Sequence, residues 1–309
     1  EKADVLADVG MVSSAAWIDY DDDGQLDLIV VGEWMPIRVF RQQDGLFVDR
    51  TAEADFAKTN GWWNSVTVTD LQGDGLPDLI LGNLGLNSLI RASRDEPARL
   101  YIHDFSQNGA PEQVLTIYKN GVSYPLAGRD ELVQAIPQLR DKFGSYSDFG
   151  ASQIEDIFPR SELRRAEVRE AYLFASSVAL NSGDGSFDLR PLPTEAQFAP
   201  IYAALPGDFD GDGYTDVVLA GNFSGVPPVR GQYDASYGLL MRGDGTGSLA
   251  AVDLEASNLV IDGQVRDLAL LRHADGGRLI VVARNDDSLQ ILRPLRLRSP
   301  QSGDAVNAP

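Results

Sequence analysis

The chain contains no cysteine and only two histidines among its 309 residues. The absence of cysteine excludes disulfide bonds, zinc sites built on thiolates and a thiol nucleophile. No apolar run reaches the roughly 18 residues that a membrane-spanning helix needs, and no G-x-S-x-G motif is present. His103 and His273 have no nucleophile motif nearby, and a histidine in such a loop is more often structural than catalytic.

Basic residues are scarce as well: 26 lysines and arginines stand against 46 aspartates and glutamates, a formal net charge of -20. This balance excludes nucleic acid as a partner, because no basic excess can replace the counterions of a phosphate backbone. It also argues against docking on an anionic membrane, and no segment favours direct membrane insertion. Hydrophobic residues make up 43% of the chain, which predicts a globular fold. The first residues are not typical of a signal peptide, so we expect that one was removed or that the chain is part of a longer protein.

The acidic residues gather in short Asp/Gly runs that recur along the chain. Each strong run follows an apolar segment and leads into a β-branched segment that ends in glycine, as in Asp19–Gly32, Asp70–Gly82 and Asp208–Gly221. A weaker copy begins at Asp104, and a degenerate one at Asp267 keeps only the strands and the first aspartate. Repeats of about 40–60 residues with several short strands predict propeller blades rather than a helical solenoid.

We therefore predict an all-β fold, a β-propeller with about five recognisable blades, and five to seven blades fit the repeat lengths. Residues from about 128 to 171 lose strand character and gain helical periodicity. We interpret this stretch as a partly helical insertion in the third blade, which residues 172–189 then complete. The propeller domain is expected to span residues 1–298, and residues 299–309 are expected to form a flexible C-terminal tail.

The spacing D-x-D-x-D-G-x-x-D suits a hard cation such as calcium. Side chains at positions 1, 3 and 5 converge on one ion, glycine at position 6 permits the turn, position 7 offers its carbonyl and position 9 returns a carboxylate. Three to four bound calcium ions are predicted. In the first and last strong loops the expected ligands are Asp19, Asp21, Asp23, Gln25, Asp27, Asp208, Asp210, Asp212, Tyr214 and Asp216. In the second loop and in the weaker fourth loop they are Asp70, Gln72, Asp74, Leu76, Asp78, Asp104, Ser106, Asn108, Ala110 and Glu112.

Other interpretations of these loops stay open. Aspartate and glycine favour ordinary turns without a metal, which is an alternative for the loop at Asp104–Glu112 and the preferred interpretation for the loop from Arg272 to Arg278. An EF-hand pair is disfavoured, because the loops lack the glutamate at position 12 and their flanks have β character.

Together with their strands, these loops resemble the FG-GAP/VCBS repeat, as in the integrin α-subunit propeller. The closing glycines Gly32, Gly82 and Gly221 belong to the same pattern. Segments 32–36, 61–64 and 82–87 resemble exported bacterial VCBS-repeat proteins akin to cartilage acidic protein. The resemblance covers about residues 10–295, but it lacks a literal Phe-Gly…Gly-Ala-Pro motif. It implies a secreted, periplasmic or cell-surface location, where calcium is abundant.

We expect a binding module rather than an enzyme, because no convergent catalytic set is visible and the metal loops account for most of the clustered carboxylates. Such a module would act in adhesion or as a scaffold for protein or glycan partners at the cell surface. Other domains of a longer parent chain or a larger assembly are further candidate partners. The alternative is a calcium-dependent polysaccharide lyase or another glycan-active enzyme.

Aromatic side chains supply the candidate ligand-binding residues, which are Trp34, Trp62, Trp63, Tyr233 and Tyr237. At most one of Trp62 and Trp63 can face inward, because neighbouring side chains on an extended chain point to opposite faces. Trp17, on the first strand, is expected to fill the core between blades.

Overall fold

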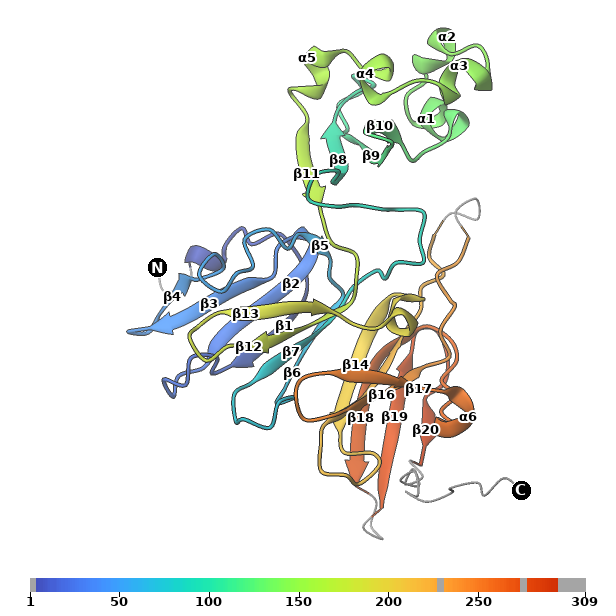
Figure 1. Ribbon diagram of the computed structural model, residues 1–309. Helices are drawn as coiled ribbons and strands as arrows, with labels where there is room; N and C mark the ends of the chain where they lie inside the picture. The colour runs from blue at the N-terminus through green and yellow to red at the C-terminus, as the bar shows by residue number, and fades with distance from the viewer. Residues whose placement is uncertain (1–3, 227–230, 273–276, 294–309) are drawn as a thin grey trace, which may run out of the picture.

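The computed structural model describes residues 4–226, 231–272 and 277–293. Its strands form five antiparallel sheets, none of which closes on itself (Figure 1). The helices of the described residues are short, and most of them gather between Arg129 and Leu163. The prediction of a mostly β chain is therefore confirmed. The predicted tail at 299–309 lies outside the described residues.

The first sheet forms from consecutive strands in the order β1-β2-β3-β4. Their bounds are Met11–Ile18, Asp27–Met35, Arg38–Gln43 and Leu46–Asp49, with β5 (Gly61–Trp62) paired to β2 and a 3-10 turn, η1 (Asp4–Leu6), before β1. The β3–β4 hairpin turns at Asp44 and Gly45, which adopt φ of 53° and 74°. Two left-handed residues are what a tight hairpin of this kind requires, and Asp-Gly supplies them at little cost.

The second sheet corrects the predicted place of the insertion. Its strands are β6 (Ser65–Thr69), β7 (Asp78–Gly82), β12 (Ser177–Asn181) and β13 (Phe187–Pro191), in the order β13-β12-β7-β6. Ser177 pairs with Leu81, so residues 172–189 complete the second blade and not the third. The prediction was wrong because nearness in sequence linked these strands to the nearest preceding repeat, whereas antiparallel pairing is decided by which buried faces fit.

The third and fourth sheets follow without interruption. The third contains β14 (Ile201–Gly207), β15 (Asp216–Gly221), β16 (Leu239–Gly243) and β17 (Leu249–Val252), and the fourth contains β18 (Val265–Arg272), β19 (Arg278–Arg284) and β20 (Gln290–Leu292). The turn η2 (Thr194–Gln197) precedes the third sheet, and helix α6 (Leu254–Ser257) follows it.

The excursion between β7 and β12 builds the remaining sheet and all the other helices. This sheet has the order β10-β9-β8-β11, with strands Val122–Pro125, Glu112–Lys119, Ala98–His103 and Glu167–Ala171. The helices α1 to α5 span Arg129–Ala135, Leu139–Lys142, Tyr146–Gly150, Ile154–Ile157 and Arg160–Leu163. They bury a core of their own around Phe105, Val114 and Ile154. The helical character expected at 128–171 is thus present up to Leu163, while residues 167–171 form a strand.

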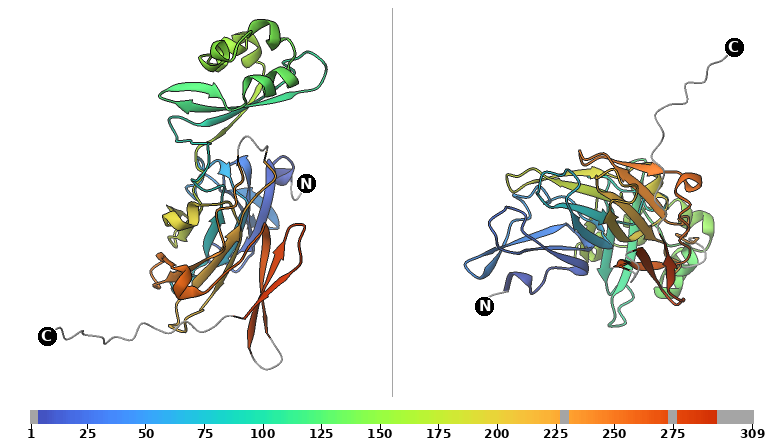
Figure 2. Two further views of the ribbon diagram at one scale, coloured as in Figure 1. Left: turned by 90° about the vertical axis from the view of Figure 1, so that its right-hand side faces the viewer. Right: turned by 90° about the horizontal axis from the view of Figure 1, so that it is seen from below.

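Four of the five sheets stack in series. The first strands of successive sheets, β1, β6, β14 and β18, lie next to one another (Figure 2). Apolar clusters fill the three spaces between the sheets, around Trp63, Leu219 and Leu268 respectively. The four sheets therefore pack face to face through apolar side chains. The sheet of β8 to β11 lies apart at one end of the molecule, so the fourth repeat is not a member of the stacked series (Figure 1).

The two ends of the series expose apolar side chains. Trp17 on β1 is 57% exposed, contrary to the prediction that it fills the core. Its strand partner is Leu28, on the face of the first sheet that points away from the second, and its ring meets Phe47 at 6.1 Å. At the other end, Leu271 and Ile291 are 52% and 61% exposed. A tryptophan on the first strand of a sheet, such as Trp17, is buried only where another sheet covers the face from which its side chain projects.

The closing glycines of the three strong repeats have a steric role. A Cβ on Gly32, Gly82 or Gly221 would overlap a backbone carbonyl of Met11, Ile201 or Pro200, respectively. Only glycine leaves room for this close approach of two backbones. The glycine that ends each repeat in the sequence therefore marks a tight contact at the end of the second strand.

Candidate metal centres

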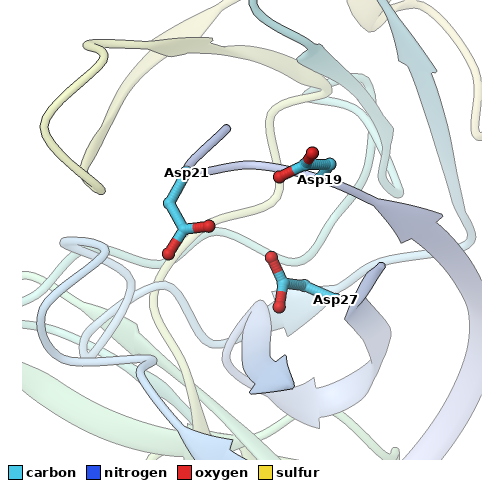
Figure 3. Close-up of side chains that lie close together, drawn as sticks. All are labelled: Asp19, Asp21 and Asp27. Carbon is cyan, nitrogen blue, oxygen red and sulfur yellow. The ribbon is translucent and has the colours of Figure 1, made fainter. Parts of the chain in front are cut away.

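The first acidic loop joins β1 to β2 and brings three carboxylates together. Oxygens of Asp19, Asp21 and Asp27 lie within 4.8 Å of one another (Figure 3). Asp27, the first residue of β2, is fully buried, whereas the other two are partly exposed. Three anionic oxygens at this separation repel one another unless a cation or protons lie between them.

The loop between β14 and β15 repeats this arrangement. Asp208, Asp210 and Asp216 bring carboxylate oxygens within 4.8 Å of one another, and Asp216 is 1% exposed. These are positions 1, 3 and 9 of the loop, the same positions as in the first cluster. Two loops some 190 residues apart, by the difference between Asp19 and Asp208, thus converge on one geometry.

Acceptor atoms that are buried and unpaired occur at the same positions. Asp21 Oδ1 and Asp27 Oδ2 are shielded from solvent and accept no hydrogen bond. In the loops at Asp70–Asp78 and Asp104–Glu112, the side chain at position 3 also has a buried oxygen without a hydrogen-bond partner, Gln72 Oε1 and Ser106 Oγ. Leaving a buried acceptor unsatisfied costs about 1–3 kcal/mol. A cation that prefers oxygen ligands would satisfy these atoms, so the residues present fit calcium.

The aspartate at position 1 organises the turn of each loop. Asp19 accepts hydrogen bonds from the backbone N–H of Asp23 and Gly24, at 3.1 and 2.9 Å. Asp104 accepts in the same way from Asn108 and Gly109, at 3.0 and 2.9 Å. In the first loop these bonds hold the turn that brings the carboxylates at positions 1, 3 and 9 together.

The aspartate at position 9 ties each loop to the third strand of its blade. Asp27 accepts the N–H of Gln42 at 2.7 Å, Asp78 that of Asn181 at 2.8 Å and Asp216 that of Gly243 at 3.0 Å. Asn181 follows Asp78 only after the whole excursion, and its bond identifies β12 as the third strand of the second blade. Position 9 thus has a structural role besides any role as a ligand.

The aspartate at position 5 takes part in the turn of each strong loop. Asp23, Asp74 and Asp212 each accept the N–H of the residue two places on, at 2.9 Å in all three loops. Neither Asp23 nor Asp212 belongs to the carboxylate clusters. The turn thus engages one oxygen of each carboxylate, and the calcium ligands expected at Asp23, Asp74 and Asp212 stay predictions. The carbonyl ligands expected at Gln25, Leu76, Ala110 and Tyr214 stay predictions.

Sequence reasoning missed an arginine beside each cluster. Arg41 on β3 forms an ion pair with Asp21 at 2.6 Å, and Arg242 on β16 forms one with Asp210 at 2.7 Å. Each arginine immediately precedes the residue whose N–H bonds to position 9. In the second blade that place holds Leu180, opposite the uncharged Gln72. Aligning the third strands of the repeats, rather than the loops alone, would have revealed this match between acid and arginine.

Burial raises the pKa of the position 9 carboxylates. The pKa of Asp27 rises from its usual 3.8 to about 6, chiefly through desolvation and in part through the nearby Asp21. Desolvation likewise raises the pKa of Asp78 and Asp216. Without a cation, these groups therefore hold protons more strongly than free aspartate does. Any metal that binds here must compete with protons at mildly acidic pH.

The weaker loops are placed differently. The loop at Asp104–Glu112 joins β8 to β9 in the separate sheet, where Glu112 accepts the N–H of Phe105 at 2.8 Å. It keeps the shape of the other loops with only two acids. His103 stacks edge-on against Phe105, with ring centroids 5.2 Å apart. Most of the degenerate loop, residues 273–276 with His273, lies outside the described residues.

The candidate ligand-binding aromatics separate into buried and exposed residues. Trp63 is fully buried, and Trp34 and Tyr233 are 7% and 8% exposed. Trp62 is half-buried and packs edge-on against Trp34 at 5.3 Å, so one tryptophan of the 62–63 pair faces inward, as expected. Tyr237 is 61% exposed. Of the five, Tyr237 offers the most open ring.

A family model for the FG-GAP-like repeat matches residues 19–81. The chain carries an FG-GAP-like repeat. The match runs from the first ligand position of the first loop to the end of β7, and so contains two of the three strong loops. It confirms the resemblance to FG-GAP/VCBS-type repeats. No curated protein matches the chain. Among the described residues, no helix is both long and apolar enough to cross a membrane.

Proposed function

We propose that this chain is an extracytoplasmic, calcium-binding module of β-propeller type that presents a binding surface to protein or glycan partners. The observation that supports it best is the recurrence of one acidic cluster, at Asp19–Asp27 and at Asp208–Asp216, the first of which lies within the FG-GAP-like match at residues 19–81. Each cluster sits on the connection between the first two strands of a blade.

Calcium in these loops would act on the fold. It would neutralise carboxylates that otherwise repel, and it would fix the connection that position 9 already ties to the third strand. A millimolar calcium concentration, as found outside cells, would fill even the loop at Asp104–Glu112, which has only two acids. The module would then present its remaining loops from a rigid frame, which lowers the entropic cost of binding a partner.

The metal part of this proposal is tested by calorimetric titration of the chelator-treated protein with calcium. Replacing Asp27 and Asp216 with asparagine should abolish the tighter phase. Asp244→Asn is the matched control, because Asp244 lies in the β16–β17 turn and caps Thr246 without joining a cluster. Equal calcium binding by the double variant and the control would refute the metal sites.

The binding part is tested by incubating the calcium-loaded protein with polysaccharides, including polygalacturonate. A binding module should leave their length unchanged and release no unsaturated sugars. Calcium-dependent shortening of a polysaccharide would instead establish a lyase or another glycan-active enzyme.

A further inference from the structure

A polar groove of about 400 Å³ lies between the third and fourth sheets. Its walls come from four segments, which follow β15, precede β16, precede β18 and follow β19. The acidic loop of the third blade enters β15 at Asp216, whereas Asn222 directly follows the other end of that strand at Gly221. The groove is therefore at the rim opposite the candidate metal centres.

Side chains that hydrogen-bond to one another and to the backbone form the floor of the groove. Asn222 is 4% exposed and has a left-handed backbone, with φ of 77°. Its Nδ2 donates to the carbonyl oxygens of Ser236 and Gly263, at 2.7 and 3.0 Å, and so links three of the wall segments. A strained residue that the surroundings hold in place is a recurrent feature of binding sites.

A second set of contacts braces the same floor. Arg266 lies over the Tyr202 ring at 4.3 Å and donates to the Asn222 carbonyl at 3.1 Å. Gln264 Oε1 accepts from the N–H of Ser224 at 3.1 Å and from Arg266 at 3.2 Å. The groove is thus built on a connected hydrogen-bond network, and its shape does not depend on a ligand.

The groups that line the groove leave one aromatic ring and several acceptors open. Tyr237 is the single aromatic residue of the lining and is 61% exposed. Asp234 and Asp286 are exposed, and neither has a partner within the described part of the chain. Asp287 differs, because it pairs with Arg284 at 3.1 Å.

We propose that this groove binds a neutral saccharide chain. The apolar face of a sugar ring would stack on Tyr237, and its hydroxyl groups would donate to Asp234 and Asp286. This inference rests on the proposed function and narrows it to the glycan class and to one site.

The lining also disfavours other ligands. A protein anchor needs an apolar pocket, and the lining offers only Tyr237. A uronic or sulfated glycan would meet three carboxylates, of which Arg284 compensates one. A bound cation needs converging carboxylates, and the clusters found in the described residues lie in the two loops of the opposite rim.

The test uses the calcium-loaded chain and a panel of probes: cello-, xylo- and mannohexaose, with polygalacturonate as the acidic comparison. Saturation-transfer NMR and calorimetry should detect binding of at least one neutral hexasaccharide and none of polygalacturonate. Tyr237→Ala should weaken that binding about tenfold or more, and Tyr237→Trp should retain it. Tyr146→Ala is the matched control. Tyr146 is also exposed, at 68%, but it lies on α3, in the excursion between β7 and β12 and not in the groove.

Several outcomes would overturn the inference: no neutral hexasaccharide binds, polygalacturonate binds as well as they do, or Tyr237→Ala binds unchanged. A melting curve of each variant shows that it folds. The inference and the proposed function fail separately. If calcium still raises the melting temperature but no saccharide binds, only the saccharide site is refuted. If calcium has no effect, the proposed function is refuted whatever the saccharide result.

Discussion

Among positions 1, 3, 5 and 9, the acidic loops at Asp19–Asp27 and Asp208–Asp216 differ from that at Asp70–Asp78 only at position 3, and the difference extends into the third strand. Where position 3 is aspartate, an arginine of that strand pairs with it. Where position 3 is Gln72, the strand carries Leu180, which is 4% exposed and belongs to the core. The position 9 bond to the third strand is the same in all three blades. The comparison shows that the loop has two separable parts. One is the position 9 hydrogen bond to the third strand, which all three loops share, and the other is the metal cluster, whose charge at position 3 is matched by an arginine of that strand.

Removing calcium should have the largest effect. A chelator should lower the melting temperature by roughly 4 °C for each tightly filled site, since saturation at about 100 times the dissociation constant contributes about 2.7 kcal/mol. Calcium titration should resolve two tight sites from weaker ones, in line with the two kinds of loop. A single class of equal sites would show that the charge difference at position 3 is without consequence.

Substitutions at positions 9 and 5 should distinguish the strand contact from the metal cluster. Asp216→Ala leaves the N–H groups of Phe209 and Gly243 without their acceptor. It should therefore cost about 2–5 kcal/mol even in chelator. Asp212→Ala removes an exposed turn acceptor that is also a predicted calcium ligand, so it should lower the melting temperature mainly when calcium is present. Thermal unfolding of both variants, with and without calcium, checks this. Equal losses in chelator would contradict the separation.

Acidity should change the size of the calcium effect. The pKa of Asp27 in the metal-free fold is about 6, above the 3.8 of an ordinary aspartate, so the folded state holds a proton that the unfolded chain has released. The contribution of Asp27 to metal-free stability is consequently full below about pH 4 and is lost, by on the order of 3 kcal/mol, as pH rises through 6. The gap between melting temperatures with and without calcium should widen from pH 5 to pH 7. A constant gap over this range would contradict proton competition.

Removing the arginine should have the smallest effect. Arg242→Leu reproduces the third strand of the second blade and leaves Asp210 unpaired. Calcium affinity should rise by a few-fold at low salt and the metal-free protein should lose about 1 kcal/mol, because a partly exposed ion pair contributes little. Calorimetry at two salt concentrations measures both. Arg190→Leu is the control, since Arg190 pairs with Asp188, which belongs to neither cluster.

Local features of this protein were determined by the sequence alone. The acidic loops and the Asp-Gly hairpin at Asp44–Gly45 each depend on residues within one turn, where backbone preference and steric fit leave few choices. For that reason the three strong loops, their strands and the helical stretch from Arg129 were correctly located.

Only the tertiary structure decided which strands share a sheet and which side chains are buried. Strands β7 and β12 pair across an excursion that the local pattern cannot bridge, and the Asp78–Asn181 bond that fixes their register joins residues 103 positions apart. The same holds for Trp17, whose exposure depends on whether another sheet covers its face. The alternation of apolar and polar residues along a strand predicts that one face is apolar. Which other sheet covers that face is decided by packing over the whole molecule.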